Sequence, residues 1–104
     1  MDNKWRVEVE VRRIAGILGE PRSSGRHRLS VDEQRKLLRE LAALEVVPIE
    51  CEFPINESAL IHFETIAKSQ FEAQITADTI TTKLEQALEK RQLRVARMSV
   101  KQQL

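Results

Sequence analysis

The imidazole and thiol side chains of this sequence, which are the usual protein ligands of transition metals, are His27, His62 and Cys51. A bound transition metal needs several such ligands, with or without carboxylates, converging on one point. The three residues fall in three different predicted elements, and each histidine is more simply explained as a solvated or packed side chain. We therefore expect neither a metal ion nor a cofactor.

Nucleophilic catalysis needs a nucleophile, a base and a group that orients the base. Cys51 falls on the inward face of an alternating stretch, where cysteine behaves as a small buried apolar residue. Glu50 and Glu52 lie on the outward face, and a solvated sheet edge explains them better than a catalytic pair of carboxylates. The segment from Gly16 to Gly19 matches neither the phosphate-loop nor the dinucleotide-binding pattern. We therefore expect that the protein is not an enzyme.

Basic residues near both ends indicate another chemistry, the binding of nucleic-acid phosphates. The stretch 19–29 is dense in turn-forming residues and predicts a flexible basic loop, and residues 91–104 hold four cations and no carboxylate. Stacking on bases needs exposed aromatic side chains, but Trp5 and the phenylalanines fall on predicted apolar faces. The cations that would contact phosphates are Arg22, Arg26, Arg28, Arg94, Arg97 and Lys101.

The element that must position these residues is the stretch 5–12, where apolar and charged side chains alternate without interruption. Because successive side chains of a strand point to opposite faces, this pattern predicts a β-strand with one buried and one solvated face. The most clearly predicted helix covers 31–45. Ser30 and Glu33 form a capping-box sequence at its start, and its leucines share one face.

The remaining elements follow from shorter patterns. Residues 46–53 alternate and predict a second strand, which Pro48 places at a sheet edge. Asn56 can cap a helix over 57–69, the alternation of 70–76 predicts a third strand, and Asp78 can cap a helix over 79–91. The last strand covers 94–101, with Ala96, Met98 and Val100 facing away from Val95, Arg97, Ser99 and Lys101.

This order predicts a single α+β domain over 1–104, with the arrangement β-α-β-(α)-β-α-β. Apart from the extra helix it is the ferredoxin-like split-βαβ arrangement. The first and last strands are then neighbours, which sets Glu8 and Glu10 near Arg97 and Lys101, and the second strand lies at an edge. The alternative is three strands with a helical hairpin over 57–91.

The composition narrows the class of protein. The chain has 104 residues, one cysteine and a net charge of +1, so it forms no internal disulfide and carries no strong global field. No apolar run is long enough to span a bilayer, and we expect a cytoplasmic protein without a membrane partner. The charge is segregated, with basic ends and an acidic middle: residues 1–30 carry +3, residues 31–53 and 54–90 carry −3 each, and residues 91–104 carry +4.

A small chain with segregated charge and no catalytic motif favours a non-catalytic protein-interaction module, such as an adaptor, regulatory or accessory subunit. The alternative is a small nucleic-acid-binding protein that uses the basic loop and the basic C-terminal segment. The expected partner is another protein or a second copy, with a symmetric homodimer as the default. The expected interface residues belong to the edge strand and the following helix: Ile49, Cys51, Phe53, Leu60, Ile61 and Phe63.

Overall fold

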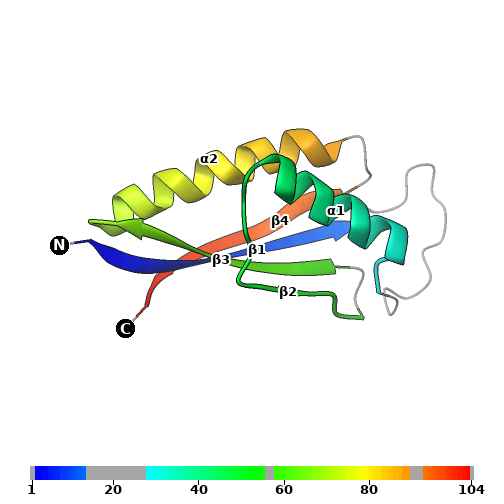
Figure 1. Ribbon diagram of the computed structural model, residues 1–104, viewed down its shortest axis with the longest axis horizontal. Coiled ribbons are helices and arrows are strands. Elements are labelled where there is room, and N and C mark those ends of the chain that lie inside the picture. The colour runs from blue at the N-terminus through cyan, green and yellow to red at the C-terminus, as the bar shows by residue number, and fades with distance from the viewer. Residues whose placement is uncertain (1, 14–27, 56–57, 90–92, 104) are drawn as a thin grey trace.

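Strand β1 (Asn3–Arg13) lies inside a four-stranded antiparallel sheet, with β3 on one side and β4 on the other. The computed structural model describes residues 2–13, 28–55, 58–89 and 93–103 (Figure 1). As the alternation predicted, Trp5, Val7, Val9 and Val11 are buried. The other elements are α1 (Val31–Ala43), β2 (Glu50–Glu52), β3 (Ser58–Ala67), α2 (Gln70–Leu88) and β4 (Leu93–Gln102).

The strand order is β2-β3-β1-β4, and every neighbouring pair is antiparallel. The predicted adjacency of the first and last strands is therefore confirmed, and so is the edge position of the second strand. Both helices cover the same face of the sheet (Figure 1). The fold is an α+β domain with a helical layer on one side and an open sheet face on the other.

Helix α1 begins and ends with defined capping structures. The Ser30 hydroxyl accepts a hydrogen bond from the Glu33 amide, and the Glu33 carboxylate accepts one from the Ser30 amide, which confirms the predicted capping box. At the other end the Glu45 amide donates to the Ala42 carbonyl and the Val46 amide donates to the Leu41 carbonyl, each at 3.0 Å. This pair of bonds is a Schellman motif, and it holds Glu45 at a φ of 59°.

The helix predicted at 57–69 and the strand predicted at 70–76 are both wrong. Residues 58–67 form β3, in which Ala59, Ile61 and Phe63 alternate into the core. Helix α2 then begins at Gln70, because the Ser69 hydroxyl accepts a hydrogen bond from the Glu72 amide. Among the described residues, 53–55 and 58–67, the extra helix before the third strand is therefore not formed, and the alternative helical hairpin over 57–91 is wrong because 58–67 is a strand.

The two edge strands also depart from their predicted form. Strand β2 is only three residues long, because Pro48 lies in the irregular segment before it. Strand β4 has nearly the predicted bounds, but its register against β1 shifts between Glu10 and Val11. Val95 therefore pairs with Val11 on the helix side of the sheet, rather than sharing the face of Arg97.

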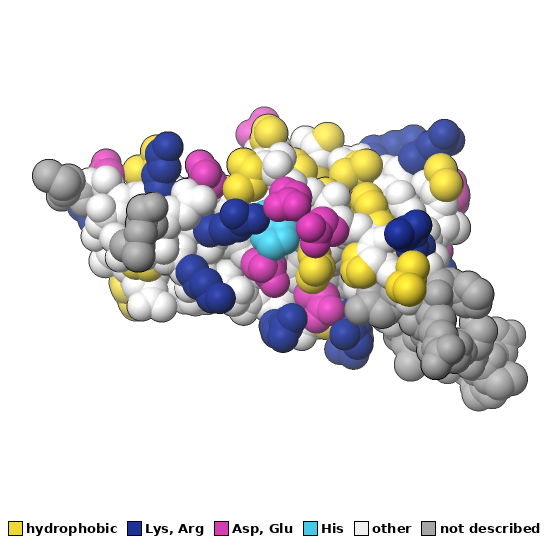
Figure 2. Space-filling model, turned by 90° about the horizontal axis from the view of Figure 1, so that it is seen from below, with side chains coloured by type: hydrophobic (Ala, Val, Ile, Leu, Met, Phe, Trp, Pro, Cys, Tyr) yellow, Lys and Arg dark blue, Asp and Glu magenta, His cyan; other side chains and the backbone are white. Residues whose placement is uncertain are grey.

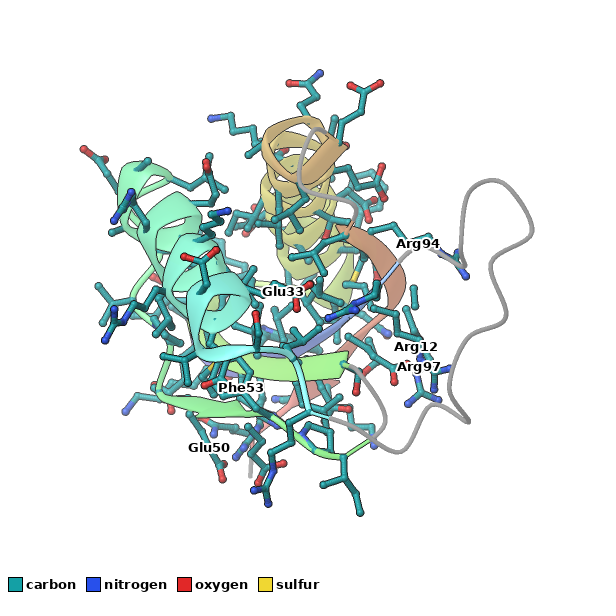
Figure 3. All side chains as sticks on the ribbon, turned by 90° about the vertical axis from the view of Figure 1, so that its right-hand side faces the viewer. Arg12, Glu33, Glu50, Phe53, Arg94 and Arg97 are labelled. Atoms are coloured by element: carbon teal, nitrogen blue, oxygen red, sulfur yellow. The ribbon has the colours of Figure 1, made fainter. Side chains whose placement is uncertain are left out.

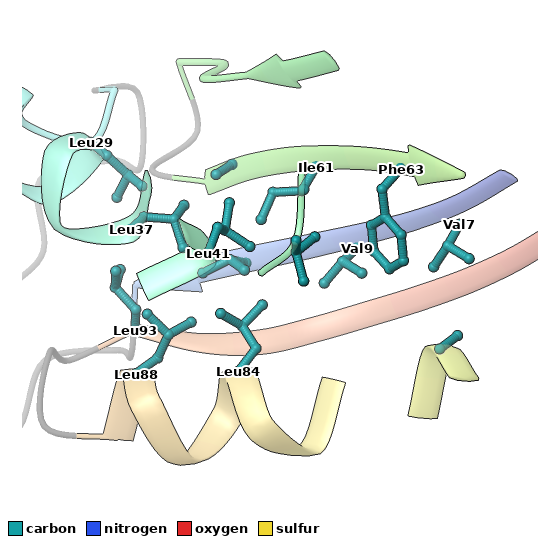
Figure 4. Close-up of a cluster of buried hydrophobic side chains, with 14 residues drawn as sticks. Val7, Val9, Leu29, Leu37, Leu41, Ile61, Phe63, Leu84, Leu88 and Leu93 are labelled. Carbon is teal, nitrogen blue, oxygen red and sulfur yellow. The ribbon is translucent and has the colours of Figure 1, made fainter. Parts of the chain in front are cut away.

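The core lies between the open sheet and the two helices (Figure 4). Leu37 and Leu41 enter it from α1, and Leu84 and Leu88 from α2, against the valines of β1. A smaller cluster at the start of β1 joins Trp5 to Ala67 and Ala73, and the Trp5 indole donates to the Ala67 carbonyl at 3.1 Å.

The predicted basic loop is described only at its end, since 19–27 lie outside the described residues. Arg28 is exposed, whereas Leu29 is buried in the core, so the chain is anchored just before α1. Arg13 forms an ion pair with Glu33, which ties the end of β1 to the start of α1. In the described part of the chain, no helix is long and apolar enough to cross a membrane.

Candidate interaction surface

The face of the sheet that turns away from the helices, here called the open face, carries mostly polar and charged side chains, with hydrophobic ones among them (Figure 2). Its composition follows from the strand register, because directly paired residues share a face. Its residues are Glu50 and Glu52 from β2; Ser58, Leu60, His62, Glu64 and Ile66 from β3; Lys4, Arg6, Glu8, Glu10 and Arg12 from β1; and Arg94, Arg97, Ser99 and Lys101 from β4.

Charge on the open face changes steadily from one edge of the sheet to the other. Strand β2 contributes two carboxylates, and β3 contributes one. Strand β1 contributes three cations and two carboxylates, while β4 contributes three cations and no carboxylate. The β2 edge is therefore acidic and the β4 edge basic, although the chain as a whole is nearly neutral.

His62 lies at the centre of this face and is only 7% exposed. The Arg6 Nε donates to His62 Nδ1 at 3.3 Å, and Glu8 Oε2 lies 3.5 Å from the same nitrogen. The two contacts exclude each other. His62 Nδ1 can accept a hydrogen bond from Arg6 only when that nitrogen carries no proton, and it can donate one to Glu8 only when it carries a proton. Arg6 also pairs with Glu50 at 3.2 Å, so the group joins β1, β2 and β3. His62 is thus a packed histidine, one of the two alternatives, solvated or packed, that the sequence left open.

Glu10 holds the basic side of the open face together. It is 8% exposed, and its two oxygens lie 3.1 Å from Arg12 Nε and 3.8 Å from Arg97 Nε. The sequence placed Glu8 and Glu10 near Arg97 and Lys101; Glu10 does lie opposite Arg97, whereas Glu8 lies opposite Ser99 and Lys101 opposite Arg6. Arg12 and Arg97, the two partners of Glu10, lie close together in Figure 3. A nearly buried carboxylate with two cationic partners keeps this part of the sheet in one arrangement.

Of the cations predicted to contact nucleic acid, the fold brings three together. Arg94, Arg97 and Lys101 are exposed on the open face of β4. Arg28 is exposed just before α1, and Arg22 and Arg26 lie outside the described residues. Sequence reasoning missed Arg12, which pairs directly with Arg94 in the register. The alternation of β1 already placed it on the polar face.

The predicted interface residues do not form one surface. Ile61 and Phe63 are buried in the core, because 58–67 is a strand whose odd-numbered residues point toward the helices. Leu60 is half-buried on the opposite, open face. Ile49 is 50% exposed beside β2, while Cys51 and Phe53 are half-buried and pack against the core. The exposed apolar residues that sequence reasoning did not assign to an interface include Val47, Phe71 and Ile75.

Cys51 is held as a neutral thiol. Burial raises the pKa of Cys51 to about 11, and the neighbouring Glu52 carboxylate acts in the same direction. A thiol is a nucleophile and a metal ligand only as the thiolate. Within the described ranges, no group of three or more His, Cys, Asp or Glu side chains is arranged to hold a metal ion.

A cavity of about 450 Å³ opens beside the β4 edge, between the end of α2 and the start of β4. Leu93 and Val95 line it with apolar surface, and Glu85, Glu89 and Arg94 add charged groups. Val95 is half-buried and Leu93 is buried, so an apolar side chain entering the cavity would contact the rim of the core.

Comparison with protein-family models, with curated proteins and with solved structures finds no match to this chain. The function must therefore be inferred from the geometry of the open face and its two edges.

Proposed function

We propose that the protein is a non-catalytic interaction module, an adaptor, regulatory or accessory subunit, which binds another chain through the open sheet face and the sheet edges. Strand β4 is ten residues long, and in the described part of the chain it pairs only with β1. An unpaired strand edge presents backbone donors and acceptors that another extended chain can use.

The observation that carries this proposal is the charge gradient across the open face. Segregated surface charge orients an approaching partner and excludes partners with the wrong charge, so it contributes to association rate and specificity. The inner contacts of the face, Arg6 with Glu50 and Glu10 with Arg12, hold the pattern in register. The surface offered to a partner is thus defined before binding, which lowers the entropy lost on association.

We also propose that the fold is of the ferredoxin-like class. Three features support this assignment: the element order β-α-β-β-α-β, the position of β1 between β3 and β4, and the two helices on one face. The helix-free face of the sheet in this arrangement is the open face proposed above as the binding surface.

The experiment compares the proteins that the tagged chain retains at low salt with those retained by two charge-reversal variants. R94E/K101E reverses two exposed cations on the β4 edge, and R35E/R39E makes the same change on α1. We expect the first variant to lose the partner and the second to keep it. Equal retention by the two variants would show that the β4 edge is not the binding surface.

A second candidate function is nucleic-acid binding, and the direct pairing of Arg12 with Arg94 favours it by concentrating positive charge beside Arg97. Two observations weigh against it: Glu10 contacts both Arg12 and Arg97, and Trp5 and Phe63 are buried, so they offer no stacking surface. If phosphates are bound, affinity for single-stranded RNA or DNA should fall steeply with salt, and replacing Arg22, Arg26 and Arg28 with alanine should weaken it. Absence of binding at low salt would exclude this function.

A further inference from the structure

We infer that the partner of the β4 edge is strand β2 of a second copy of this chain, so that copies associate head to tail. The inference rests on the proposed interaction function and names the partner. Both edges of the sheet belong to the same chain, and their open-face charges are opposite: Glu50 and Glu52 on β2, and Arg94, Arg97 and Lys101 on β4.

Like charge disfavours the two symmetric ways of joining edges. Two β4 strands brought together by a two-fold axis would face each other with three cations each and no carboxylate. Two β2 strands joined in the same way would bring the Glu50 and Glu52 carboxylates of one copy opposite those of the other. Like charges directly opposite on neighbouring strands are destabilising, whereas opposite charges stabilise the pair. Joining β2 to β4 is the only edge pairing in which the charges attract.

The strand directions are also compatible. Because β2, β3, β1 and β4 alternate in direction, β2 and β4 of one chain are antiparallel. A second copy placed beside β4 without being turned over therefore continues the antiparallel sheet, with the helices of both copies on the same side. The open faces of the two copies then lie on the same side of the joined sheet, so the β2 carboxylates of one copy lie beside the β4 cations of the other.

The register follows from matching these faces. If Glu50 of the second copy lies opposite Arg97, the bulged segment of β4 brings Glu52 of that copy opposite Arg94. Phe53 of that copy then lies beside Leu93 on the helix side, at the cavity of about 450 Å³. Phe53 is half-buried in its own chain, where it packs against the core, so only its exposed part can contact the second copy. In this arrangement Phe53 would cover the apolar side of the cavity, which Leu93 and Val95 form.

The stoichiometry is a direct consequence of this contact. A head-to-tail contact leaves one free β2 edge and one free β4 edge, so association proceeds beyond a dimer or closes into a ring. Strand β2 pairs through only three residues, so each contact is small. We therefore expect weak association that increases with protein concentration and decreases with salt.

Sedimentation equilibrium of the full chain tests the inference with two edge variants. R94E/K101E makes β4 net acidic. E50Q/E52K makes β2 net basic, and the amide oxygen that E50Q introduces can still accept from Arg6, the partner of Glu50 in the native chain. Each variant alone has edges of like charge, so its self-association should weaken by about tenfold or more. An equimolar mixture of the two should associate again, and so should one chain that carries all four substitutions. Far-UV circular dichroism of each variant checks that the substitutions leave the fold intact.

Three results would overturn the head-to-tail contact. The first is a wild-type chain that remains a 12.0 kDa monomer at every concentration at low salt. The second is a wild-type dimer that forms no larger species and whose dissociation constant E50Q/E52K does not change, and the third is a mixture of the two variants that does not associate. A monomeric wild-type chain that still retains a different protein, and loses it in R94E/K101E, would refute this inference while the interaction function stands. A wild-type chain that neither self-associates nor retains a partner would remove both.

Discussion

Replacing Glu45 with glycine is expected to stabilise the fold, because Glu45 has a backbone conformation that is unfavourable for any residue with a β-carbon. Its φ is 59°, in the left-handed region. The hydrogen bonds from the Glu45 and Val46 amides to the last turn of α1 fix this conformation, and buried Val46 closes the motif against the core. Glycine is the usual residue at this position of a Schellman motif, since it adopts the left-handed region without a steric cost.

The expected size of the effect follows from two opposing terms. The left-handed conformation costs a non-glycine residue about 1–2 kcal/mol. Glycine in turn adds about 0.5–1 kcal/mol of conformational entropy to the unfolded chain, which offsets part of the gain. The net increase in the free energy of unfolding is then about 0.5–1 kcal/mol, or roughly 2–5 °C in Tm for a domain of this size. Urea denaturation followed by circular dichroism measures it.

The matched control is Glu45→Ala, which removes the exposed carboxylate but keeps the β-carbon. We expect its stability to stay within about 0.5 kcal/mol of the wild-type value, as for most surface substitutions. If Glu45→Gly is no more stable than Glu45→Ala, the left-handed conformation is not a cost to this fold, and the proposed origin of the stabilisation is wrong.

Three further predictions concern buried or capping groups. Because the pKa of Cys51 is raised from 9.0 to about 11, its alkylation at pH 8 should be about a hundredfold slower in the folded chain than in urea, and equal rates in both states would contradict this. The folded chain binds the thiol proton more tightly than the unfolded chain, so the free energy of unfolding should fall as pH rises from 9 to 11. Replacing Trp5 with phenylalanine removes the donor to the Ala67 carbonyl and should lower the free energy of unfolding by about 1–3 kcal/mol, whereas a change below about 0.5 kcal/mol would mean that the carbonyl finds another donor. Ser69→Ala should cost about 1 kcal/mol by removing the N-cap of α2, and a helix that begins at Asp78 instead would leave stability unchanged.

The sequence predicted the elements correctly where the local pattern of side chains is compatible with only one kind of secondary structure. The eight-residue alternation of β1 is incompatible with a helical face, and the capping box of α1 marks a start that a strand would not have. The proximity of Glu10 to Arg97 followed from the adjacency of the first and last strands. These predictions are confirmed because the tertiary structure uses each pattern in the way that local physics favours.

The error over 57–76 arose where two periods fit the same residues. In 58–67, Leu60, Phe63 and Ile66 have helical spacing, while Ala59, Ile61 and Phe63 alternate, and the fold buries the alternating set. The strand predicted over 70–76 would have placed Phe71 and Ile75 on one apolar face, but on α2 they are 74% and 50% exposed. The available signal was Ser69 followed by Glu72, which repeats the Ser30 and Glu33 spacing that identified α1.

The open face could be predicted only in part, because its composition depends on register. The shift between Glu10 and Val11 adds one residue to β4 and moves Val95 to the helix side. Side chains alternate with a period of two, so a single extra residue exchanges the faces of all residues beyond it. No local pattern in 94–101 marks the bulge. The surface of β4 therefore required the three-dimensional pairing.

The charge gradient of the open face arises from the connection of the strands and not from any one segment. Along the chain the two ends are basic and the middle is acidic. In an extended chain the two basic ends would therefore be separated by the whole acidic middle. The strand order brings β1 and β4, from the two ends, together on one side of the sheet, and leaves β2 and β3, from the middle, on the other. Alternation then directs the charged residues of each strand to the open face, because the helices bury the apolar ones. A different order, with β2 between β1 and β4, would place carboxylates among the cations and cancel the gradient. The two edges have opposite charge because the topology sorts the segments by their place in the chain, and this sorting makes a sheet whose two edges are electrostatically complementary to each other.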